Sequence, residues 1–144
     1  MTGKRSEKAS EPMDQFAGRQ ASRLLGKLAF RVRHAAKRPN EEAIHDLRVS
    51  IRRLSQCLRE FRQFFPRHRT RKILAQLAKM MDLAAEARNR DIALELIGGG
   101  SSAKSAFAAN LRKEREVAKQ ELTAALTRWR RHDFSRKWRP WLDR

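Results

Sequence analysis

The segment from 40 to 65 carries a row of basic side chains next to a row of apolar ones. On a helix that turns about 100° per residue, four basic residues fall within about 60° of one another: His45, Arg48, Arg52 and Arg59. Like charges at this spacing destabilise an isolated helix by a few tenths of a kcal/mol per pair. The pattern therefore predicts a surface that an external anion neutralises.

Two further segments repeat this arrangement. The expected helix over residues 14–37 carries a basic row on one narrow stripe, Arg23, Lys27, Arg31, His34 and Arg38, and the expected helix over 103–129 carries Arg112, Arg115 and Lys119 along one edge of its apolar face. In an antiparallel bundle we expect such rows to meet in a groove, where low-dielectric walls focus their field on an anion. The alternative is that each row is an ordinary solvated face.

Arginine makes up much of this charge, and this favours phosphate as the group bound. The planar guanidinium donates two parallel hydrogen bonds to phosphate oxygens. Two more charges, Arg88 and Asp91, share a face with Ile73, Leu77, Met81 and Ala84. Buried charges need partners, so either Arg88 and Asp91 pair with each other to hold the helix end, or Asp91 orients Arg88 or His45 toward a ligand.

Catalytic chemistry has little support in the sequence, and we expect no enzyme activity. The four histidines are scattered, and the single Glu-x-x-His pair, Glu42 with His45, falls short of the two pairs that a di-metal bundle uses. Carboxylates are not clustered as Mg²⁺ in a phosphohydrolase would require. Cys57 has no evident histidine partner, and we expect it to be a packing residue. The glycines 98–100 follow a helix and lack the spacing of a nucleotide-binding loop. No cofactor or metal is expected.

Composition indicates a polyanionic partner. The chain has 144 residues, with 34 Lys and Arg against 16 Asp and Glu, for a formal charge of +18. Charge of this size repels itself in a compact state, which favours nucleic acid, an anionic membrane face or polyphosphate as partner. One cysteine, no apolar leader and no apolar run of membrane-spanning length predict a cytoplasmic protein without membrane association.

The spacing of apolar residues predicts an all-α fold. Residues 1–12 are polar and aperiodic and are expected to be a disordered arm, with one helical domain over 13–144. Breakers at 39–40, 66, 98–102 and 132–133 divide this domain into helices over about 14–37, 40–65, 69–97 and 103–129. We expect an antiparallel four-helix bundle, with Phe107 and Leu111 facing inward and with the tail residues Phe134, Trp138, Trp141 and Leu142 capping one end.

The run from Glu42 to Leu54 closely resembles the signature of the CHAD family, the conserved histidine α-helical domain. That signature reads His-x-Leu-Arg-Val-x-x-Arg-Arg-Leu, and here it is His45-Asp46-Leu47-Arg48-Val49-Ser50-Ile51-Arg52-Arg53-Leu54. The stretch 87–92, Ala-Arg-Asn-Arg-Asp-Ile, is similar to the second segment of the family. The tail 126–142 resembles the segment that closes a CHAD half. Ser55, Ala85 and Asn89 depart from the residues usual there.

This resemblance implies a non-catalytic protein that binds inorganic polyphosphate through a basic surface, in association with polyphosphate granules. It implies that His45, Arg48, Arg52 and Arg53 face the ligand and that Arg88 and Asp91 form the second signature. The usual CHAD module has two four-helix halves and this chain supplies one, so we expect a homodimer that rebuilds the pair.

The alternative function is a nucleic-acid-binding or generic polyanion-binding module that uses the same basic face. Base readout would favour Asn or Gln among the arginines, or exposed aromatic side chains for stacking. The basic rows largely lack both, and this favours a ligand made of phosphate alone. Because histidine changes charge near neutral pH, His45 predicts tighter binding at about pH 6 than at about pH 8.

Overall fold

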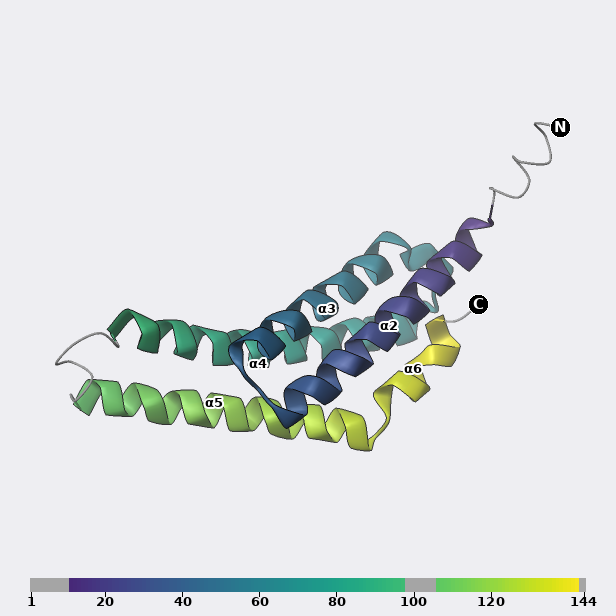
Figure 1. Ribbon diagram of the computed structural model, residues 1–144. Helices are drawn as coiled ribbons and strands as arrows, with labels where there is room; N and C mark the ends of the chain where they lie inside the picture. The colour runs from purple at the N-terminus through teal and green to yellow at the C-terminus, as the bar shows by residue number, and fades with distance from the viewer. Residues whose placement is uncertain (1–10, 98–105, 143–144) are drawn as a thin grey trace.

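The computed structural model describes residues 11–97 and 106–142 (Figure 1). These ranges contain helices and no strand, which confirms the all-α class. The elements are α2 (Met13–Lys37), α3 (Glu41–Glu60), a short 3₁₀ helix η1 (Arg62–Phe64), α4 (Arg67–Ile97), α5 (Ala106–Arg131) and α6 (Phe134–Leu142). Most of the expected arm at 1–12 and the glycine-rich break at 98–102 lie outside the described residues.

The start of α3 is set by its cap. The Asn40 side chain accepts a hydrogen bond of 2.8 Å from the backbone N–H of Ala43. The end of α3 differs from the prediction: the helix stops at Glu60 and not near Phe65. Pro66 disfavours the helical conformation in the residue before it, and Phe65 is extended (φ −118°, ψ 151°). Between the end of α3 and Phe65, the chain forms the single 3₁₀ turn η1.

The core lies where the four long helices meet. Helix α2 packs along α3 and α4 packs along α5, and α3–α4 and α2–α5 contacts join the two pairs. The largest fully buried side chains are Leu25, Leu28, Ile44, Leu47, Ile51, Leu54, Leu58, Ile73, Leu77, Leu122, Leu126 and Leu142. Each long helix therefore contributes part of its predicted apolar stripe, and one core unites the bundle.

The C-terminal tail forms a helix of its own. Asp133, at a left-handed φ of 50°, turns the chain between α5 and α6. Helix α6 packs against α2 and buries Phe134, Trp138 and Leu142, which confirms the predicted cap at that end of the bundle (Figure 1).

The opposite end of the molecule corrects one prediction. The C-terminal end of α4 and the N-terminal end of α5 extend beyond α2 and α3 (Figure 1). Phe107, expected in the core, is 65% exposed there, and Leu111 is only half-buried. The apolar spacing of α5 continues past the point where neighbouring helices can cover it.

Candidate anion-binding groove

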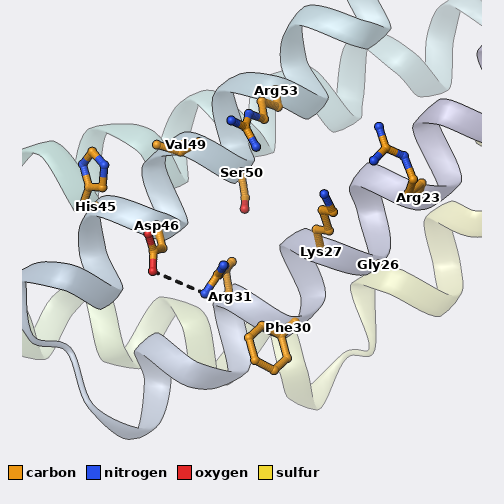
Figure 2. Close-up of a pocket in the computed structure, with 10 residues that line it drawn as sticks. All are labelled: Arg23, Gly26, Lys27, Phe30, Arg31, His45, Asp46, Val49, Ser50 and Arg53. Atoms are coloured by element: carbon orange, nitrogen blue, oxygen red, sulfur yellow. Dashed lines mark hydrogen bonds and ion pairs between the residues drawn. The ribbon is translucent and has the colours of Figure 1, made fainter.

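A groove of about 660 Å³ runs between α2 and α3. Four of its ten lining residues are Lys or Arg, three from α2 and one from α3. Its lining is Arg23, Gly26, Lys27, Phe30, Arg31, His45, Asp46, Val49, Ser50 and Arg53. Figure 2 shows Lys27 and Arg31 directed from α2 toward α3, and Arg53 and Ser50 directed from α3 toward α2.

The α2 wall follows from helical spacing. Arg23, Lys27 and Arg31 are each four residues apart, so they rise along one face at steps of about 6 Å. The three belong to the predicted basic row of five, and the structure places them together in the groove, whereas His34 and Arg38 do not line it. A row of cations at this spacing suits an extended anion that runs along the helix axis.

One acid interrupts the positive lining. Nη1 of Arg31 lies 3.3 Å from Oδ2 of Asp46, and the guanidinium also lies over the Phe30 ring at 5.3 Å. The ion pair with Asp46 and the contact with the Phe30 ring together fix the position of the Arg31 guanidinium. Within the described ranges Lys27 and Arg53 form no ion pair, so their charge is open to a ligand.

The predicted basic row on α3 is divided, because His45 lines the groove and the other three residues do not. Arg48, Arg52 and Arg59 are centred about 110° around α3 from the residues of that helix that line the groove. Glu41 begins their flank and pairs with Arg88 of α4, which shows that this flank faces α4. Nε of Arg48 is buried there without a hydrogen-bond partner among the described residues.

The alternative of a mutual ion pair between Arg88 and Asp91 is wrong, because each of the two side chains pairs elsewhere. Arg88 lies 2.8 Å from Glu41 and 3.8 Å from Glu95. With His45, it lines a smaller hollow of about 350 Å³ at the start of α3. Arg88 therefore pairs with Glu41 of α3 and with Glu95 two turns further along α4, and not with Asp91 one turn away.

Asp91 belongs instead to the contact between α4 and α5. Its carboxylate is 4.0 Å from Nε of Arg115 and 3.8 Å from Nζ of Lys119, and its side chain is largely covered. Arg112 is exposed three residues before Arg115. The third predicted row therefore lies along α4, apart from the groove.

The described ranges contain no cluster of side chains suited to metal or thiol chemistry. No three His, Cys, Asp or Glu side chains gather there in a way that could hold a metal ion. Cys57 is buried in the core, where burial raises the pKa of its thiol, Glu60 raises it further and Arg23 lowers it. A protonated buried thiol is a weak nucleophile.

Sequence reasoning missed part of the groove. Phe30, Val49 and Ser50 line it but were not predicted, and Arg53 was indicated only by the family resemblance. Phe30 was detectable as an aromatic residue between Lys27 and Arg31, off the apolar stripe of α2. It stacks on His34 at a centroid distance of 6.1 Å.

Comparisons with known proteins identify one family. A family model described as "CHAD domain" matches residues 19–144, nearly the whole chain. No significant match was found among curated proteins or among solved structures. None of the helices in the described ranges is both apolar enough and long enough to cross a bilayer.

Proposed function

The chain belongs to the CHAD domain family, and on that premise we propose that it binds inorganic polyphosphate in the groove between α2 and α3. CHAD domains are associated with polyphosphate binding in general. The observation that carries the proposal for this chain is the groove itself, which gathers Lys and Arg side chains and His45 from two helices around one carboxylate.

The chemistry of the groove matches a polymer of phosphates. Arg23 and Arg53 offer planar forks for phosphate oxygens, and Lys27 offers a compact charge between them. A long polyanion that lies along α2 would meet one cation per helical turn. Each neutralised phosphate releases condensed counterions, so we expect affinity to fall steeply as salt rises.

We propose binding without turnover of the polymer. Hydrolysis of phosphate chains generally uses clustered carboxylates that hold Mg²⁺. The groove lining has one carboxylate, Asp46, which is engaged with Arg31. The expected outcome is a constant length of polyphosphate after incubation with the protein and Mg²⁺, measured by gel electrophoresis.

Competition binding tests the proposal. Protein bound to fluorescent long-chain polyphosphate is titrated with unlabelled polyphosphate, DNA and RNA at two salt concentrations. We expect polyphosphate to compete at least about tenfold better than either nucleic acid, roughly 1.4 kcal/mol. Equal competition by DNA or RNA would instead support the alternative, a generic polyanion-binding or nucleic-acid-binding module.

Paired variants locate the site. Lys27→Ala with Arg53→Ala removes two groove cations and is expected to weaken polyphosphate binding about tenfold. The matched control is Arg33→Ala with Arg71→Ala, because both residues are exposed and neither lines the groove. The control removes the same charge, so equal losses in the two variants would contradict a site in the groove.

We also propose that the chain forms a homodimer, as the sequence analysis predicts. Of six large apolar side chains that are exposed in the described ranges, three lie near the C-terminal end of α4 or the N-terminal end of α5: Ile92, Leu96 and Phe107. Exposed apolar patches of this kind mark contact surfaces. We propose that a second copy packs there, and light scattering at tens of micromolar, with Phe107→Ser as the comparison, should show a dimer that the variant loses.

A further inference from the structure

A second cleft, separate from the groove, lies between α4, the end of α5 and α6. Its volume is about 640 Å³, which is in the range of small-molecule sites. Its lining is Lys72, Gln76, Lys79, Met80, Leu83, Ala125, Arg128, Trp129, His132, Phe134, Lys137, Trp138 and Trp141. It shares no residue with the groove between α2 and α3.

The apolar wall of this cleft is a packed aromatic cluster. The Trp129 ring is 4.7 Å from that of Phe134 and 5.4 Å from that of Trp138, and Phe134 and Trp138 are 5.1 Å apart. Trp138 and Phe134 are buried, whereas Trp129 and Trp141 keep part of their surface exposed. The packing holds Trp129 in place, so its accessible surface is a preorganised platform for a flat ring.

The rim of the cleft is cationic. Lys72 and Lys79 are seven residues apart on one face of α4, and Arg128 and Lys137 approach from α5 and α6. The lining contains no Asp or Glu, in contrast to the groove with its Asp46. Gln76 lies between the two α4 lysines and offers an amide that can both donate and accept hydrogen bonds.

We propose that this cleft binds a nucleoside phosphate, with the base against the tryptophans and the phosphates at the lysines. The aromatic side chains of the lining would contact the base, and its Lys and Arg side chains would contact the phosphates. Inorganic phosphate chains have no flat surface to place on Trp129, whereas a nucleobase stacks on aromatic side chains irrespective of sequence. The Arg69 guanidinium already lies over the Trp141 ring at 4.8 Å, so Trp129 is the stacking platform. The amide of Gln76, between Lys72 and Lys79, would donate to the phosphate oxygens.

Intrinsic fluorescence reads this cleft selectively, because all three tryptophans of the chain line it and none lines the groove. The protein is titrated with adenosine triphosphate, with inorganic triphosphate as the control that keeps the phosphates and lacks the base. Excitation at the red edge of the tryptophan band limits absorption by the nucleotide. We expect saturable quenching by the nucleotide and at least about tenfold weaker binding of triphosphate, roughly 1.4 kcal/mol.

Two variants complete the test. Lys72→Ala with Lys79→Ala should weaken nucleotide binding about tenfold, whereas the groove variant Lys27→Ala with Arg53→Ala should leave it within about twofold of the unmodified protein. Triphosphate that binds as tightly as the nucleotide, or an acidic peptide that displaces the nucleotide at equal concentration, would overturn the proposal. So would the absence of nucleotide binding by both fluorescence and calorimetry. None of these outcomes depends on whether the groove binds polyphosphate.

Discussion

Arg31 of α2 and Asp46 of α3 form an ion pair across the groove, with Nη1 of the arginine 3.3 Å from Oδ2 of the aspartate. The pair joins the two walls at the one point where the lining carries a negative charge. Both side chains are about a third exposed, so the pair contributes little to stability, about 0–1 kcal/mol. Its larger effect is on the field that an incoming anion meets.

Replacement of that carboxylate should strengthen polyphosphate binding. Asp46→Asn removes a negative charge from the groove and frees Arg31 for the ligand, so we expect affinity to rise about threefold to tenfold at low salt. Fluorescence anisotropy with labelled polyphosphate measures the change. Arg31→Ala is the companion variant and should weaken binding. A loss of affinity in Asp46→Asn would mean that the aspartate is needed to position Arg31.

The two flanks of α3 should contribute unequally to binding. Lys27→Ala with Arg53→Ala and Arg48→Ala with Arg52→Ala each remove two positive charges, but only the first pair lines the groove. We expect about a tenfold loss for the first pair and at most about a threefold loss for the second. Anisotropy titrations with labelled polyphosphate at one salt concentration measure the loss of affinity in each variant. Circular dichroism checks that each variant is folded.

The reverse order of losses would place the ligand on the flank that faces α4. In that case the buried, unpartnered Nε of Arg48 would be the first atom to consider as a phosphate donor. The same titrations therefore decide between the groove and the arginines of the family signature.

Gly26→Ala should stabilise the protein without closing the groove. Gly26 lies within α2, and a Cβ added there would have Nη2 of Arg139 as its nearest neighbour at 3.9 Å, an ordinary contact. Alanine in a helix interior is favoured over glycine by about 0.5–1 kcal/mol, so the midpoint of thermal unfolding should rise by a few degrees. Calorimetry measures it, and polyphosphate affinity should stay within about twofold. A lower midpoint would show that α2 cannot accept the methyl group against α6.

The buried thiol of Cys57 should make stability fall at alkaline pH. Burial raises its pKa in the folded protein, so the unfolded chain loses the thiol proton first. The stabilising contribution is therefore complete below the pKa of the unfolded thiol and is lost as pH rises toward the folded pKa. Urea unfolding gives the free energy of unfolding of the protein and of Cys57→Ala. The difference between these two free energies should narrow as pH rises from the pKa of the unfolded thiol to that of the folded thiol. A difference independent of pH would contradict the prediction.

The same burial predicts slow reaction with alkylating agents. The native protein should react with iodoacetamide far more slowly than the urea-unfolded chain, because the thiolate is the nucleophile and the folded state disfavours it. Equal rates would indicate that α3 opens readily around Cys57.

The sequence alone determined the helical class, most helix ends and the polycationic character of the surface. These properties depend on local information: the period of apolar residues selects helix over strand, Asn40 and Pro66 act on their immediate neighbours, and net charge is a sum over residues. Phe107 marks the limit of such reasoning, because the period continues where neighbouring helices no longer cover it.

Tertiary structure decided which basic residues share a site. The apolar stripe of α3 has a flank on either side, and the sequence does not specify which flank faces α2. Packing placed Arg53 in one groove with Lys27 and left Arg48 and Arg52 outside it, since α2 covers only one side of the stripe. Likewise, Asp91 meets Arg115 and Lys119 because α5 lies against that face of α4. Partners on another helix depend on how the helices pack, and spacing along one helix carries no information about them.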